Sequence, residues 1–229
     1  MTPNSAVEFL LQKYSVRQSV SFLPDGEVNV NGKALPLLPW RSERRFIEFK
    51  NLVHEGYLKG LSTVRVCHID AEGSDLYRIL YREADICEWI TGTRIREIFA
   101  IRNDRALNAI AKTDAGTVFT FELAATQSKT APVIDKHEVI AEKGVICDRA
   151  VDTQVPQSSV YVLGSDGSRQ EYTDVDAELY GMDPATCAEV RQAFLIARDG
   201  LDLRADAEHL NAIVAAARES VRTVENIRL

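Results

Sequence analysis

Seven strand-like segments follow one another between residues 95 and 172, and no helical segment separates them. Each is rich in β-branched, aromatic or other apolar residues at alternate positions, and they cover 95–102, 107–113, 118–125, 137–142, 145–150, 159–163 and 169–172. Short turn sequences such as Lys143-Gly144 join several of them. Because hairpin turns connect antiparallel strands whereas parallel strands need long crossovers, this region predicts a largely antiparallel sheet.

Helical segments lie on both sides of the strand-rich region. The most regular covers about 75–91, where Ser74 is the expected N-cap, Gly92 the stop, and apolar residues share one face. Four further helices are expected. The first ends at about Lys13, and the second follows a cap at Ser42 and runs to His54. The third starts at Asp183-Pro184 and ends before Gly200, and the fourth covers 205–220. A strand is expected at 62–69, and residues 17–35 predict a hairpin or small meander.

The predicted fold is therefore α+β. It has a largely antiparallel, open-faced sheet with helices packed on one face, plus a small N-terminal helix and hairpin. We expect residues 1–40 to form this appendage and residues 41–229 to form one α/β domain.

Composition narrows the partners of such a domain. The 229 residues carry a net charge of −7, which disfavours a nucleic-acid partner because phosphate backbones attract clustered Lys and Arg. No apolar run approaches the roughly 20 residues that span a bilayer, so we expect a cytoplasmic protein that makes no membrane contact. The four cysteines are widely spaced without a CxxC pair, which favours reduced thiols over disulfides or a zinc site.

Charged residues recur along one side of the helix expected at 75–91. Asp75, Arg78, Arg82 and Asp85 follow one another at spacings of three, four and three. Such a pattern is typical of solvated ion pairs on a helix surface. It also suits a substrate site, because an arginine fork can hold a carboxylate in a bidentate pair.

Three residues elsewhere are candidates for acid or base catalysis. His68 lies at the end of the strand expected at 62–69, close to Glu72, and His137 lies at the start of another strand. A hydrogen-bonded structural role is the alternative for both histidines, and we expect no metal at His68. Lys136, beside His137, is a candidate substrate contact. The long polar segment 148–159 is a further place where binding residues could lie.

Four phrases resemble one family in their order along the chain. They are RRFIEFKNLVHEGYLKGLSTVRV, YREADICEWITG, KHEVIAEKGVICDR and AAARESVRTVENIRL. Together they resemble, over residues 41–229, the C-terminal substrate domain of the glucose-fructose oxidoreductase and inositol dehydrogenase family, also written Gfo/Idh/MocA. The resemblance implies a sugar, inositol or sugar-acid ligand and a homo-oligomer formed through the open sheet face.

The sequence departs from this family in two respects. It contains neither the glycine-rich GxGxxG loop nor the E-K-P lysine motif of the family's Rossmann domain, so no NAD(P) site is expected in this chain unless a separate Rossmann domain partners it. The alignment also places Asp85 at the family's aspartate but Arg82 where relatives carry histidine. Because a guanidinium does not shuttle protons near neutral pH, the resemblance implies binding of an anion or hydroxyl at Arg82.

Three functions remain open, and whether the protein is an enzyme stays undecided among them. The chain can be a binding domain or a subunit that works with a separate Rossmann partner. It can be the C-terminal part of an NAD(P)-dependent sugar oxidoreductase. It can also be a cofactor-independent isomerase or lyase acting on a keto-sugar or carboxylated ring, with His137, His68 or Glu72 as acid or base.

Overall fold

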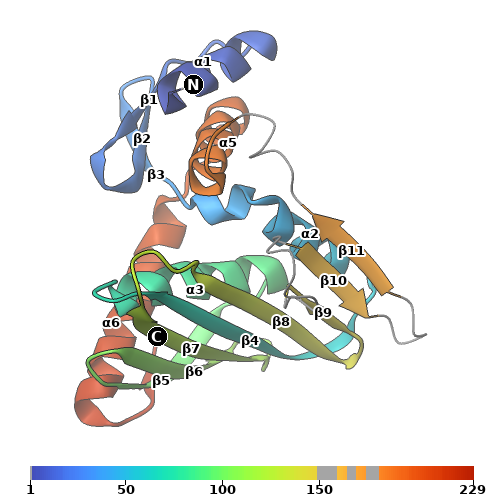
Figure 1. Ribbon diagram of the computed structural model, residues 1–229, viewed down its shortest axis with the longest axis vertical. Helices are drawn as coiled ribbons and strands as arrows, with labels where there is room; N and C mark the ends of the chain where they lie inside the picture. Colours follow the sequence, from blue (N-terminus) through green and yellow to red (C-terminus); the bar gives the residue numbers. More distant parts are fainter. Residues whose placement is uncertain (1, 149–158, 164–168, 174–180) are drawn as a thin grey trace. The chain divides into compact units, whose positions relative to one another are not determined.

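A computed structural model describes residues 2–148, 159–163, 169–173 and 181–229 (Figure 1). Contacts divide the chain into two compact units: Met1–Ile47 with Asp174–His209, and Glu48–Thr173 with Leu210–Leu229. Each unit is considered by itself, and we call them the small unit and the sheet unit. The division at residue 40 that the sequence suggests stays a prediction.

The small unit combines helices with a three-stranded antiparallel sheet. Its elements are α1 (Pro3–Lys13), β1 (Val20–Leu23), the 3-10 turn η1 (Pro24–Gly26), β2 (Glu27–Val30), β3 (Lys33–Pro36), the 3-10 turn η2 (Pro39–Ser42) and α5 (Pro184–Asp199). Thr2 and Ser5 cap the start of α1 reciprocally, and Asp183 caps α5. Helix α5 packs against α1 and η2. The predicted N-terminal helix and small meander are confirmed.

Two helices have residues in both units, α2 (Arg44–His54) and α6 (Arg204–Thr223). The predicted cap of α2 was wrong. Ser42 ends η2 instead, and its buried hydroxyl has no hydrogen-bond partner in the described part of the chain. The turn η2 ends at Ser42, two residues before α2 begins at Arg44. The first hydrogen bond of the helix therefore runs from the backbone N–H of Ile47 to the backbone carbonyl of Glu43.

The sheet unit contains a mixed sheet with nine strands in its described residues. They are β4 (Lys59–Ala71), β5 (Ile95–Arg102), β6 (Ala106–Thr113), β7 (Val118–Gln127), β8 (Ile134–Lys143), β9 (Val145–Cys147), β10 (Ser159–Leu163), β11 (Arg169–Thr173) and β12 (Ile227–Arg228). Their spatial order is β11-β10-β9-β8-β4-β7-β6-β5-β12. The predicted largely antiparallel character is confirmed, although β4 and β7 run parallel.

The parallel pair has a simple topological cause. After β4 the chain enters α3 (Leu76–Thr91) and only then forms the meander β5-β6-β7, which returns to β4 from the far side. Strand β4 thus lies between β7 and β8, in the middle of the order. Its central position places the last residues of β4 between two neighbouring strands and under α3.

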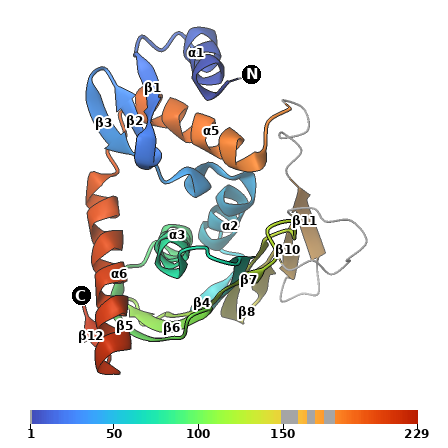
Figure 2. The same ribbon diagram turned by 60° about the vertical axis from the view of Figure 1, so that its left-hand side comes forward.

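One face of this sheet is covered by helix α3, as Figure 2 shows. Alternate residues of the central strands, such as Val64, Val66 and Phe121, are buried on this side. On the opposite face Ile110 is 56% exposed, and no described helix covers it. The predicted packing of helices on one face is confirmed.

The ends of α3 show one further difference from expectation. Asp75 rather than Ser74 is the N-cap, because the Asp75 carboxylate accepts a 2.9 Å bond from the backbone N–H of Tyr77. Gly92 ends the helix in the left-handed conformation at φ 71°, as expected of a glycine stop. None of the described helices combines the length and apolarity that crossing a membrane requires.

Candidate functional site

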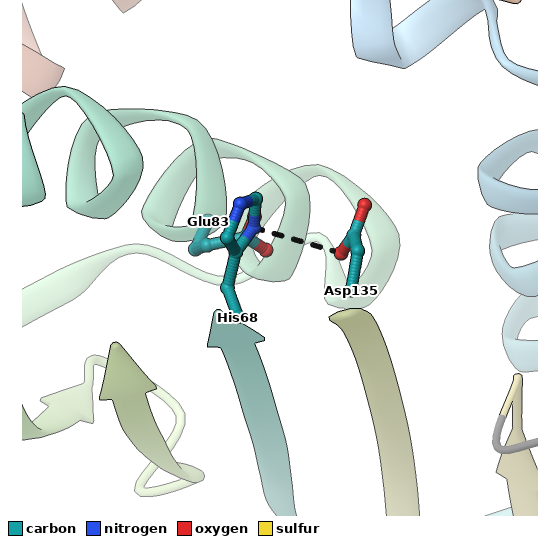
Figure 3. A group of neighbouring side chains, drawn as sticks. All are labelled: His68, Glu83 and Asp135. Carbon is teal, nitrogen blue, oxygen red and sulfur yellow. Dashed lines mark hydrogen bonds and ion pairs between the residues drawn. The ribbon is translucent and has the colours of Figure 1, made fainter. Parts of the chain in front are cut away.

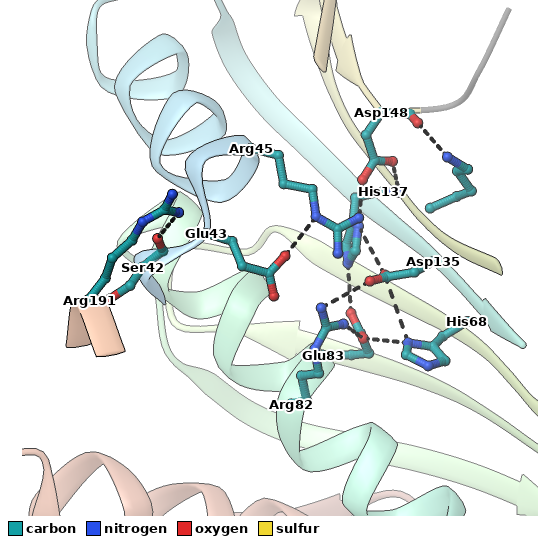
Figure 4. Close-up of polar contacts among 11 residues, drawn as sticks. Ser42, Glu43, Arg45, His68, Arg82, Glu83, Asp135, His137, Asp148 and Arg191 are labelled. Atoms are coloured by element: carbon teal, nitrogen blue, oxygen red, sulfur yellow. Dashed lines mark hydrogen bonds and ion pairs between the residues drawn. The ribbon is translucent and has the colours of Figure 1, made fainter. Parts of the chain in front are cut away.

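A cluster of charged and imidazole side chains lies between α3 and the central strands of the sheet. Figure 3 shows His68 at the end of β4 and Asp135 at the start of β8, both beside Glu83 of α3. Strand register explains the meeting, since His68 is opposite Asp135 and His137 is two residues further along β8. Alternation along a strand points both β8 side chains toward α3. We call His68, Arg82, Glu83, Asp135, His137 and Asp148 the inner cluster (Figure 4).

Glu83 is the centre of the inner cluster. Its Oε1 accepts a hydrogen bond from Nδ1 of His68 at 2.8 Å, and its Oε2 accepts one from Nε2 of His137 at 2.7 Å. The Arg82 guanidinium also donates to Oε1. Burial opposes ionisation of this carboxyl, but the positive charges of Arg82 and His137 outweigh burial and the nearby Asp135, so the pKa of Glu83 lies well below its ordinary value. Glu83 is therefore a buried carboxylate.

His137 carries its charge between two carboxylates. Its Nδ1 donates to Oδ2 of Asp148 at 3.0 Å, while Nε2 donates to Glu83. The backbone N–H of His137 donates to Oδ1 of the same Asp148. Burial disfavours an imidazolium, but Asp148, Glu83 and Asp135 together raise the pKa of His137 to about 10. Because both ring nitrogens donate, His137 is an imidazolium that holds Glu83 in place.

Only part of the inner cluster can be reached by a ligand. The side chains of Glu83 and His137 have no exposed surface, whereas those of Arg82, Asp135 and His68 are 17%, 14% and 8% exposed. Nη2 of Arg82 donates to Oδ2 of Asp135 at 2.9 Å. These three residues form the accessible edge of the cluster, and the rest is support behind it.

Several predicted site residues lie in or beside the inner cluster. Arg82, His68 and His137 belong to it. Lys136 does not point into it, because it alternates with His137 on β8; its Nζ instead donates to the backbone carbonyl of Asp148 at 2.9 Å. Roles for these residues in binding or catalysis stay predictions.

The remaining predicted residues are not brought together. Asp75 is the N-cap of α3, Arg78 is exposed, and Asp85 is fully buried in the same helix. Glu72 is exposed and lies 3.5 Å from Arg105. Most of the predicted polar segment 148–159, residues 149–158, lies outside the described residues.

Sequence reasoning singled out none of the three carboxylates of the inner cluster, Glu83, Asp135 and Asp148, although Asp148 begins the predicted polar segment 148–159. A signal for Glu83 was present in the helical pattern. The apolar face of α3 includes Leu76, Leu80 and Cys87, and Glu83 occupies a position between them at helical spacing. A charged residue on an otherwise apolar face predicts a buried partner of opposite charge, and this signal would have identified Glu83.

A metal ion is one chemical possibility for part of this cluster. His68, Glu83 and Asp135 each offer one ligand atom, and these atoms lie within 4.8 Å of one another. Imidazole with two carboxylates suits several transition-metal ions. However, Arg82 already donates to both of these carboxylates, so the guanidinium provides the positive charge that the two acids require.

A hollow lies on the open face of the sheet. Its volume is about 180 Å³, and its lining includes Arg65, Cys67, Glu122, Ile134, Lys136 and Glu138. Lys136 thus lines this hollow, and its Nζ also donates to the backbone carbonyl of Asp148.

Comparison with known proteins identifies the fold. The sequence matches no family model and none of the curated proteins compared with it. A putative oxidoreductase from Thermotoga maritima superimposes with a TM-score of 0.65 at 14% identity, over 85% of this chain and 63% of the other. This is the fold of the Gfo/Idh/MocA-type oxidoreductases. The resemblance that the sequence suggests is therefore confirmed at the level of fold.

Two further solved structures carry informative ligands. The scyllo-inositol dehydrogenase from Lactobacillus casei, with bound NAD(H) and scyllo-inositol, matches with a TM-score of 0.60 at 17% identity, over 83% of this chain and 63% of that one. An Agrobacterium radiobacter oxidoreductase in complex with NAD+, L-tartaric acid and magnesium matches with a TM-score of 0.66 at 14% identity, over 85% and 64%. The chain thus spans less than two thirds of these oxidoreductases.

Proposed function

We propose that this protein is the substrate-binding side of an oxidoreductase-type system and binds a sugar, inositol or sugar acid at the accessible edge of the inner cluster. One observation carries the proposal. The Arg82 guanidinium, held by Glu83 and Asp135, is partly exposed beside His68. A fixed cation next to an imidazole and a carboxylate suits a small molecule with both acidic and hydroxyl groups.

The chemistry of the three accessible residues supports this class of ligand. A guanidinium has five N–H donors in a planar fork, so it can serve protein carboxylates and a further anion together. Asp135 offers carboxylate oxygens as acceptors for ligand hydroxyls. The ligands named for two structures of the same fold, scyllo-inositol and L-tartaric acid, are a polyol and a hydroxy acid.

Oxidation of such a ligand needs a hydride acceptor. Because the sequence contains no GxGxxG loop, we propose that a nicotinamide nucleotide reaches the ligand from a separate Rossmann-domain chain. The chain can instead be the C-terminal part of a longer NAD(P)-dependent oxidoreductase. The buried charge network favours one further candidate, a cofactor-independent isomerase or lyase, because such a network can support proton transfer without a nucleotide.

Ligand-dependent thermal stability tests the binding proposal. The purified chain is titrated with scyllo-inositol, tartrate, galactarate, glucuronate and NAD+. A ligand at 100 times its Kd stabilises the folded state by about 2.7 kcal/mol, so a clear rise in Tm is expected for at least one polyol or sugar acid.

The substitution Arg82→Met separates this site from others. It is expected to weaken binding of the carboxylated ligands at least tenfold and to affect scyllo-inositol less. Only a carboxylate can form a bidentate ion pair with the Arg82 guanidinium. Arg105→Met, at a 70% exposed side chain, is the matched control. Binding that Arg82→Met leaves unchanged, or stabilisation by NAD+ alone, would contradict the proposal.

We also propose that the chain forms a homo-oligomer through the open face of its sheet. The exposed Ile110 and Ile134 on this face support it, because apolar side chains on an uncovered sheet favour association. Sedimentation velocity at micromolar concentration should show a dimer or larger species. Ile110→Asp is expected to shift this species toward the monomer, and a wild-type protein that stays monomeric would contradict the proposal.

A further inference from the structure

We propose that His68 is the group that exchanges a proton with the bound molecule, and that it acts through Nε2. The inference rests on the proposed function, because it assigns a role at the same accessible edge. The observation behind it is that the two ring nitrogens of His68 have different hydrogen-bond partners.

The two nitrogens of His68 have different partners. Nδ1 is 2.8 Å from Oε1 of Glu83 and 3.8 Å from Oδ1 of Asp135. For Nε2, no hydrogen-bond partner exists among the described residues, although the side chain is more than nine-tenths buried. Since a carboxylate only accepts, Glu83 places the proton of a neutral His68 on Nδ1. The lone pair is then on Nε2, the nitrogen that has no hydrogen-bond partner among the residues that the structure describes.

The carboxylate behind His68 is unusually well fixed. Glu83 accepts from His137 on its second oxygen, and His137 is in turn held by Asp148. This chain of hydrogen bonds runs from Asp148 through His137 and Glu83 to His68. Glu83, His137 and Asp148 have no exposed carboxylate or imidazole surface of note, so they are positioning residues that act through His68. A carboxylate that orients an imidazole and offsets its charge is a recurrent device of proton-transfer sites.

The O–H bond of a ligand hydroxyl breaks, its electron pair remains on oxygen, and a new N–H bond forms at Nε2 of His68. Glu83 offsets the resulting imidazolium charge. A nicotinamide nucleotide supplied by a separate Rossmann-domain chain would be the hydride acceptor that turns the deprotonated ligand alcohol into a carbonyl compound.

Arg82 favours this assignment over a metal ion at the same residues. Its guanidinium donates to Oε1 of Glu83, the oxygen that also accepts from His68, and to Asp135. A divalent cation between these ligands would have to displace that charge. The proton-transfer role needs no such rearrangement, because every charged partner of Glu83 is already in place.

The tautomer of His68 can be measured directly by long-range 1H–15N NMR of the intact chain. His68→Asn assigns the signals. In the wild type at a pH where the ring is neutral, the expected spectrum shows a protonated Nδ1 and an unprotonated Nε2. Glu83→Gln should give a mixture of tautomers because an amide can either donate or accept, whereas the exposed Glu72→Gln should change nothing. The wild-type spectrum is decisive even if Glu83→Gln does not fold.

Three results would overturn the assignment. They are a proton on Nε2 in the neutral wild-type ring, a tautomer that Glu83→Gln leaves unchanged, and stoichiometric binding of added Zn²⁺ that shifts the Nε2 signal. A second measurement compares the Kd of scyllo-inositol and galactarate in the wild type and in His68→Leu. His68→Leu should weaken binding because it removes the hydrogen-bond acceptor at Nε2, whereas the exposed Glu72→Gln should leave binding unchanged; equal affinities in wild type and His68→Leu would also contradict the proposal. If neither ligand binds, the proposed function fails, while the NMR result still decides the state of His68.

Discussion

Two of the charged groups in the sheet unit, one that includes residues of α3 and one on α6, differ in almost every physical respect. On α3, Arg82 and Glu83 belong to the inner cluster, where the Glu83 side chain has no exposure. On α6, Glu219 and Arg222 form a pair whose side chains are 44% and 72% exposed. Both groups combine an arginine with a glutamate within one helical turn. In sequence they look alike.

The difference lies in what removal of one partner leaves behind. In water the partner of a lost charge is solvated at little cost, so an exposed pair contributes up to about 1 kcal/mol. In the inner cluster the remaining charge is buried without its counterion, which costs about 3–5 kcal/mol. The comparison therefore predicts a graded series of effects on stability, from the centre of the inner cluster to the surface of α6.

His137→Ala should have the largest effect. It removes the imidazolium between Glu83 and Asp148 and leaves two buried carboxylates facing each other's charge. We expect a loss of about 3–5 kcal/mol in the free energy of unfolding, measured by urea denaturation. His54→Ala at an exposed position is the control, and a loss below about 1 kcal/mol at His137 would show that the inner cluster does not behave as a buried network.

Much of the fold could be predicted from sequence because local signals set the ends of its elements. Pro3 and Pro184 start α1 and α5, and glycines end α5 and α3, as expected. The order of the strands in the sheet was harder to predict from the sequence. The pairing of β4 with both β7 and β8 joins residues more than 50 positions apart, and no local pattern encodes it.

The inner cluster was only partly predictable for the same reason. His68 and His137 stood out by residue type, but their meeting depends on the register of β4 and β8. Glu83 was hidden in the apolar stripe of α3. The charged stripe from Asp75 to Asp85 suggested one common site, yet burial separates its members, since Arg78 is exposed and Asp85 is buried.

Alkaline pH should weaken the inner cluster without any substitution. The pKa of His137 is raised from 6.5 to about 10 in the folded protein, so its contribution to stability is fully present below about pH 6.5 and is lost as the pH rises through 10. We expect wild-type stability to fall across this window, by less than in His137→Ala because neutral imidazole keeps one hydrogen bond. The difference between wild type and His137→Ala in urea midpoints from pH 6 to 10 should therefore narrow, and a constant difference would contradict the charged state of His137.

Asp135→Asn should have an intermediate effect. This carboxylate is 14% exposed and accepts a 2.9 Å bond from Arg82, so water can partly replace what the substitution removes. Hydrogen bonds to charged groups contribute about 1.5–3 kcal/mol, and we expect a loss at or below the lower end of this range. Asp114→Asn is a suitable control, because the Asp114 side chain is 42% exposed and lies 3.7 Å from Arg96. A loss in the free energy of unfolding as large as that of His137→Ala would mean that the accessible edge is as well shielded from water as the centre of the inner cluster.

Glu219→Gln should have the smallest effect of the series. The Glu219 carboxylate accepts from Arg222 one turn further along α6, and this bond lowers the pKa of Glu219. Both side chains are open to solvent, however, so we expect only a small loss in the free energy of unfolding, the smallest of the series. That small difference should disappear at 1 M salt, where the Debye length falls to about 3 Å, whereas the cost of His137→Ala should persist. If salt instead reduces both effects alike, the inner cluster is reached by solvent ions and the contrast between the two groups fails.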